Sequence, residues 1–260
     1  MRVSAFFVPF FTIIASVLGY YLRASERINV FDPETGLAMR NAETTFWLIL
    51  LSAIFIISLI LFGAIAAARH KALPGFESVF GTDPLAYPII FVLIGISWIV
   101  GTYMQFLLLR LDGVIPTIDI FFLIFSAISA ICVTFFAIEM YQDSRRKAPY
   151  ALSVIPTVFL CFWLILVYRQ NASNPVLLGY VYICLALVAN ALSFYFTSGF
   201  LYGKPQPGKS IVAYYAAIYF CAISLADDHS IGIKVILCAM IAANLIHSVL
   251  LLRNLQKKYA

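Results

Sequence analysis

The chain has 260 residues, of which 63% are hydrophobic and 11% are charged, with a net charge of +5. A soluble domain is about 45–50% apolar and about 25% charged, so this composition excludes a water-soluble globular protein and requires lipid to cover the remaining apolar surface. The positive charge does not call for nucleic acid as a partner, because Lys and Arg gather in the cytoplasmic loops of membrane proteins.

Eight apolar segments follow one another along the chain, and each approaches the roughly 20 residues that a membrane-spanning helix needs. No polar stretch between them is long enough for a soluble domain. The sequence therefore predicts an all-α, polytopic integral membrane helical bundle that forms a single transmembrane domain over residues 1–260. The expected spans are 4–22, 45–68, 85–109, 117–138, 150–168, 176–200, 210–226 and 231–252.

Helix-start signals precede several of these segments. Asp83-Pro84 stands before the third span and Pro116-Thr117 before the fourth, where a capping side chain or a proline favours the first turn. Ser210 is a candidate N-cap for the seventh span, 210–226, which is the shortest of the eight. We expect the first span to be retained, because no small-residue cleavage site follows it.

The distribution of basic residues predicts the orientation. With eight spans, 11 of the 17 Lys and Arg residues fall on the side that holds both termini, and six fall on the opposite side. Because the richer side is cytoplasmic, we expect both termini in the cytosol. The membrane that we expect is the bacterial cytoplasmic membrane.

Ionisable residues gather where the expected spans end on the outer side, around the third and seventh loops. Such groups can form a vestibule that selects a charged solute. The structural alternative is a tight polar hairpin at 227–230, with Asp119 and Lys234 in first turns where they favour the helix dipole or extend toward water. The candidate vestibule residues are Arg110, Asp112, Asp119, Asp227, Asp228, His229 and Lys234.

Two expected spans carry polar residues three or four positions apart, which places them on one helical face. Asn190 and Ser193 share a face of the sixth span, and Asn244 and His247 share a face of the eighth. Polar faces of this kind usually form hydrogen bonds between helices, worth about 0.6 kcal/mol on average. A polar path through the bundle or a headgroup site is the alternative.

Residues 203–210 match the phosphate-loop pattern through Gly203, Gly208, Lys209 and Ser210. That motif binds phosphate through successive backbone N–H groups of a strand-to-helix turn. Here two prolines within the segment have no N–H to donate, and the segment joins two membrane spans. We therefore interpret it as a basic turn and predict no nucleotide site.

The remaining residues suggest neither a metal nor a cofactor. The five cysteines lie inside apolar segments without metal-ligand spacing, so we expect no metal site, no cofactor and no catalytic residues. The leading hypothesis is a small-solute transporter or permease-like protein. A non-catalytic membrane subunit or receptor-like partner is the first alternative, and an intramembrane lipid-modifying enzyme that uses Asn190, Asn244 and His247 is the second. The expected partners are the lipid bilayer and, under the first alternative, other membrane subunits.

Overall fold

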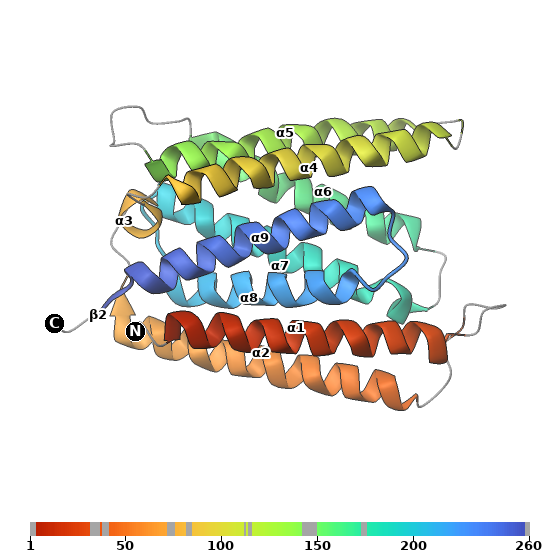
Figure 1. The fold of residues 1–260 in the computed structure, drawn as a ribbon, viewed down its shortest axis with the longest axis horizontal. Helices are drawn as coiled ribbons and strands as arrows, with labels where there is room; N and C mark the ends of the chain where they lie inside the picture. The colour runs from red at the N-terminus through yellow and green to blue at the C-terminus, as the bar shows by residue number, and fades with distance from the viewer. Residues whose placement is uncertain are drawn as a thin grey trace.

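The chain folds into long helices that lie side by side along one axis, as a computed structural model shows (Figure 1). The sequence-based prediction of an all-α, polytopic helical bundle is confirmed. The structure describes residues 4–31, 37, 42–71, 76–81, 85–111, 113, 116–141, 150–172 and 176–257.

Within this described part, eight helices have 16 residues or more, and each overlaps one of the expected spans. They are α1 (Ser4–Asn29), α2 (Glu43–Arg69), α4 (Ala86–Leu111), α5 (Thr117–Tyr141), α6 (Ile155–Gln170), α7 (Val181–Leu201), α8 (Pro207–Ser224) and α9 (Ile231–Asn254). The shorter elements are α3 (Phe76–Phe80), the 3-10 turns η1 (Tyr150–Val154) and η2 (Leu177–Gly179), and the two-residue strands β1 (His70–Lys71) and β2 (Gln256–Lys257), which pair antiparallel.

Seven of the long helices in the described part are long and apolar enough to cross a membrane, which makes this a multi-pass integral membrane protein. Helix α8 is the exception, although we expected a span there. The difference has a physical reason, because α8 packs against α1, α2, α7 and α9 and every residue from Ala213 to Cys221 is buried. A helix that packs against four others needs little lipid-facing apolar surface, so it can carry Ser and Tyr residues.

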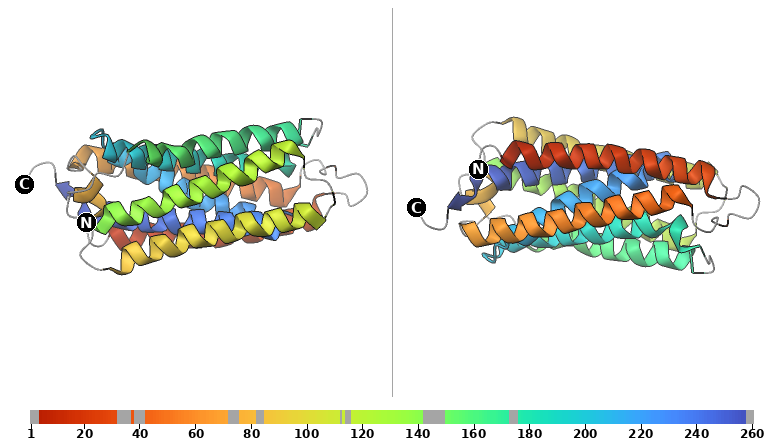
Figure 2. Two further views of the ribbon diagram at one scale, coloured as in Figure 1. Left: turned by 90° about the horizontal axis from the view of Figure 1, so that it is seen from above. Right: turned by 90° about the horizontal axis from the view of Figure 1, so that it is seen from below.

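The start of α1 and the end of α9 lie at the same end of the bundle (Figures 1 and 2). We call this the terminal end; it holds the start of α1, the end of α9 and the β1–β2 pair. The opposite end, which holds the end of α1 and the loop between α8 and α9, is called the far end.

Glycines bring two pairs of helices into backbone contact. A Cβ added at Gly232 of α9 would lie 2.6 Å from the backbone oxygen of Gly101 on α4. A Cβ added at Gly208 of α8 would lie 2.5 Å from the backbone oxygen of Gly63 on α2. Small residues permit this close approach, which is how membrane helices gain packing contacts.

Candidate functional site

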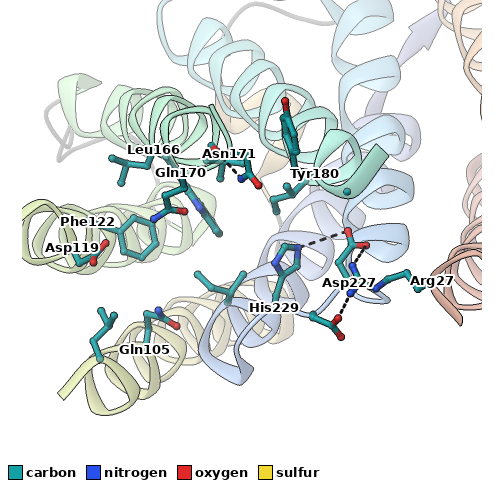
Figure 3. A pocket seen from close by; sticks show the side chains of 17 residues that line it. Arg27, Gln105, Asp119, Phe122, Leu166, Gln170, Asn171, Tyr180, Asp227 and His229 are labelled. Carbon is teal, nitrogen blue, oxygen red and sulfur yellow. Dashed lines mark hydrogen bonds and ion pairs between the residues drawn. The ribbon is translucent and has the colours of Figure 1, made fainter. Parts of the chain in front are cut away.

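A cavity of about 290 Å³ lies at the far end of the bundle, between α4, α5, α6, α7 and the loop that joins α8 to α9 (Figure 3). We call it the far-end cavity. Phe122, Trp163 and Ile183 are among the apolar residues that line it. The polar side chains that line it are Arg27, Gln105, Asp119, Gln170, Asn171, Tyr180, Asp227, Asp228 and His229.

The structure brings part of the expected vestibule together at this cavity. Asp119 lies on the α5 wall, while Asp227 and His229 lie across from it (Figure 3), and Asp228 also lines the cavity. Arg110 and Lys234 are not among the lining residues, because Arg110 is exposed in the last turn of α4 and Lys234 lies beyond the loop in α9. Asp112 lies outside the described residues.

A buried ion network anchors the wall of the cavity on the α1 side. Arg23 of α1 is fully buried, and its Nε donates to Oδ1 of Asp227 at 2.7 Å. Its Nη1 donates to Oε2 of Glu26 at 2.6 Å, and its Nη2 donates to the carbonyl oxygen of Leu178 at 2.9 Å. One guanidinium therefore connects α1 to the η2 turn and to the loop between α8 and α9.

Glu26 extends the network to α2. Its Oε1 accepts a hydrogen bond from the hydroxyl of Thr45 at 2.6 Å, and the carboxylate itself is fully buried. The ring of Tyr182 lies 4.9 Å from the Arg23 guanidinium carbon, which places a cation–π contact on the remaining face. The buried part of the network holds one cation, Arg23, against two carboxylates, and the partly exposed Arg27 lies at its edge, 3.8 Å from Oδ1 of Asp227.

Asp227 presents an unpartnered oxygen. Its Oδ2 is buried and has no hydrogen-bond partner in the described part of the chain, and the nearest cation-forming atom recorded for it is Nε2 of His229, at 3.9 Å. Burial raises the pKa of Asp227, although the Arg23 guanidinium opposes this rise. Leaving such an oxygen unsatisfied costs about 1–3 kcal/mol, so this atom is a candidate to accept a hydrogen bond from a ligand.

His229 closes the same wall. Its Nε2 lies 2.9 Å from the hydroxyl of Ser224, and burial lowers its pKa while the nearby Asp227 carboxylate opposes the change. The imidazole is therefore neutral at neutral pH. Arg27, beside it, pairs with Asp228 and lies 3.8 Å from Oδ1 of Asp227.

The opposite wall carries Asp119 in the first turn of α5, and this carboxylate forms no ion pair with any described residue. Gln105 of α4 accepts a hydrogen bond from the hydroxyl of Ser230, the N-cap of α9. With His229 neutral, the cavity lining holds three carboxylates and one guanidinium. Its electrostatic potential therefore favours cations and hydrogen-bond donors over anions.

The expected polar faces in the middle of the bundle meet only in part. Asn244 of α9 donates to Oδ1 of Asn190 on α7 at 2.8 Å, and the Asn190 amide in turn reaches Sγ of Cys221 on α8 at 3.0 Å. Ser193 bonds within its own helix, to the carbonyl of Asn190. One amide pair thus joins α7 to α9 and contacts α8 between them.

His247 is separate from this amide pair. Its ring lies within 6 Å of four aromatic rings, and its Nε2 is buried without a hydrogen-bond partner in the described part of the chain. The surrounding rings belong to Phe80, Phe91, Phe136 and Tyr214. None of Asn190, Asn244 and His247 lines the far-end cavity or the apolar groove on α8 that is described below.

The segment that resembles a phosphate loop lies at the terminal end. Gly203 adopts a positive φ of 69° in the turn before α8, and Gly208 packs on the backbone of α2. Ser210 donates to the carbonyl of Gln206 within the first turn of α8. Lys209 is exposed and is the one charged residue that lines the apolar groove described below.

Among the described residues, no group of three or more His, Cys, Asp or Glu side chains is placed to hold a metal ion. Comparison with protein families, with curated proteins and with solved structures finds no match to this chain. The function of the far-end cavity therefore follows from the residues that line it and from the ion network behind it.

Proposed function

We propose that this membrane protein is a small-solute transporter whose solute binds first in the far-end cavity. The observation that carries the proposal is the buried, unpartnered oxygen of Asp227 in the wall of a space of about 290 Å³. Ligand sites usually measure about 300–1,000 Å³, so the solute is small. The excess of carboxylates in the lining favours a cation or a neutral hydrogen-bond donor.

Isolated polar groups lie along α7 beyond the cavity, in the direction that a solute would take through the bundle. Asn190 lies two turns beyond the cavity residue Ile183 on α7, roughly 10 Å at 1.5 Å per residue. A further two turns along, Thr197 hydrogen-bonds to the hydroxyl of Tyr214 on α8 at 2.7 Å. These neutral groups follow α7 toward the terminal end, with apolar packing between them.

Orientation belongs to the same proposal, in which the terminal end faces the cytosol. The terminal end carries the exposed basic side chains of Arg69, Lys204, Lys209 and Arg253. Cytoplasmic ends of membrane proteins are enriched in Lys and Arg. A reporter fused after Ala260 should be active only in the cytosol, and activity confined to the exterior would overturn this orientation.

The test of transport is uptake into vesicles that contain the purified full chain. The panel is grouped by charge: small organic cations, zwitterionic amino acids, neutral polyols and small anions. We expect uptake above protein-free vesicles for a cation or a neutral donor, and none for the anions. Uptake equal to protein-free vesicles across all four groups would overturn the proposal.

A matched pair of variants locates the site. Asp119→Asn removes the cavity carboxylate that has no ion-pair partner, so we expect the apparent affinity for a cationic solute to fall about tenfold. Glu43→Gln changes an exposed carboxylate at the same end that does not line the cavity, and its uptake should match the wild type. Equal losses in the two variants would assign the effect to surface charge instead.

A further inference from the structure

A second hollow lies on the side of the bundle, where α2 and α7 flank α8. This groove has a volume of about 620 Å³ and an almost wholly apolar lining. Its floor is formed by small residues of α8, Gly208, Ala213 and Ala216, while larger side chains such as Ile60 and Leu192 stand exposed along its walls. The groove is thus open toward the surroundings of the bundle and does not reach the far-end cavity, with which it shares no lining residue.

The groove has the depth of one leaflet. Its floor runs along α8 from Gly208 to Phe220, which is roughly 18 Å at 1.5 Å per residue. Half of a hydrocarbon core of about 30 Å is roughly 15 Å. The groove therefore extends from the terminal end of the bundle to about the middle of the membrane, as a single acyl chain does.

The mouth of the groove is basic. Lys209 lines it, and the exposed side chains of Arg69, at the end of α2, and Lys204, before α8, lie at the same end of the bundle. Basic pockets between membrane helices bind anionic headgroups, and each Lys or Arg near the surface contributes about 1 kcal/mol.

We propose that this groove is a binding site for an anionic phospholipid, with one acyl chain lying on α8 between α2 and α7 and the phosphate beside Lys209. The apolar lining suits an acyl chain, the length of the groove matches one leaflet, and the basic mouth suits an anionic headgroup. A second copy of this protein is the competing occupant, but the cluster of cations at the mouth disfavours a like-charged partner there. The proposal does not rest on the transport function, because lipid retention is measured without any solute.

The experiment is native mass spectrometry of the full chain released from nanodiscs that contain equal amounts of phosphatidylglycerol and phosphatidylcholine. The wild type should retain one lipid, predominantly phosphatidylglycerol. Lys209→Ala should lower the ratio of bound phosphatidylglycerol to phosphatidylcholine about fivefold, since about 1 kcal/mol corresponds to that factor. Ala64→Phe, which places a ring into the groove from an exposed position on α2, should lower retention of both lipids.

Two variants serve as matched controls. Arg253→Ala removes an exposed cation at the same end, and Ala53→Phe adds a ring to α2 at an exposed position that does not line the groove. Both should retain lipid as the wild type does. The proposal fails if Lys209→Ala leaves the lipid ratio unchanged, if Arg253→Ala lowers it equally, or if Ala64→Phe keeps the bound lipid. A wild-type dimer that Ala64→Phe dissociates would assign the groove to a second copy of the chain.

Discussion

The far end and the middle of this bundle both join helices through buried polar side chains, but the chemistry of the side chains differs. At the far end, α1 is joined to the loop between α8 and α9 by full charges, with Arg23 placed between Glu26 and Asp227. In the middle, α7 is joined to α9 by neutral amides, Asn190 and Asn244. Both sets of side chains are almost completely buried.

The difference follows from distance to water. A charge in the middle of a membrane is costly to place, whereas a charge near a helix end can be inserted while it is still hydrated and become buried only when its partners close over it. Neutral amides carry a smaller penalty when one partner is absent. The bundle thus keeps its strong, specific contacts beside the far-end cavity and its weak ones inside.

The largest expected effect is at Arg23. Arg23→Met keeps most of the side-chain volume but leaves Glu26 and Asp227 buried without their cation, which should cost about 3–5 kcal/mol. The measurement is reversible unfolding of the purified protein in mixed micelles. Neutralising both carboxylates in the same chain, with Glu26→Gln and Asp227→Asn, should recover much of the loss.

Arg27 provides the control for this substitution. It lies one helical turn further along α1 and pairs with Asp228, whose side chain is 84% exposed. Exposed ion pairs contribute about 0–1 kcal/mol, so Arg27→Met should have a small effect. Equal losses for Arg23→Met and Arg27→Met would show that burial does not set the strength of this network.

A smaller effect is expected from pH at His229. Burial lowers its pKa below the ordinary 6.5, so below about pH 6.5 the unfolded chain takes up a proton that the folded chain does not. Stability is therefore lost as the pH falls, by at most about 1.4 kcal/mol at pH 5.5. Asp227 acts in the opposite sense, because its raised pKa lets the folded state bind a proton earlier.

His229→Gln isolates the histidine contribution from that of Asp227. The quantity to compare is the difference in unfolding free energy between the wild type and His229→Gln at pH 7.5 and at pH 5.5. On going from pH 7.5 to pH 5.5, the wild type should lose more unfolding free energy than His229→Gln does. If the wild type instead loses less unfolding free energy than His229→Gln does, Asp227 holds the imidazole of His229 in its protonated form.

The smallest expected effect is the coupling between Asn190 and Asn244. A double-mutant cycle with alanine at each position should give about 0.6 kcal/mol, the average for hydrogen bonds between membrane helices. A cycle between Asn190 and Ser126 of α5, which bonds to Trp98 instead, should give a value near zero. A coupling of several kcal/mol at the amide pair would remove the contrast between the two regions.

Much of the helical architecture could be predicted from the sequence, because lipid imposes a simple rule on apolar length. That rule was least informative for α8, whose partners are other helices and whose residues therefore need not be uniformly apolar. The spacing within each span predicts polar faces that include Asn190 and Asn244, because the positions along one helix fix its faces. The contact between Asn190 and Asn244 depends on how α7 packs against α9, and the spacing of residues within one helix carries no information about that packing.

The candidate site was harder to predict. The sequence predicts a first span that ends at residue 22, because Arg23 and Glu26 interrupt the apolar run, but α1 continues to Asn29 and buries both. A faint signal was present, since Arg23, Glu26 and Arg27 are spaced three and four apart as on one helical face. Their partner Asp227 is 204 residues away from Arg23, and no local pattern connects positions so far apart.

That separation has a consequence for how the protein is made. Ribosomes add roughly 5–20 residues per second, so Arg23 is synthesised on the order of 10–40 s before Asp227. During this interval the first hairpin must wait in the bilayer with its guanidinium still hydrated at the surface. The loop between α8 and α9, synthesised long after α1, is what finally draws α1 into place, which makes assembly of the far end a late step in biogenesis.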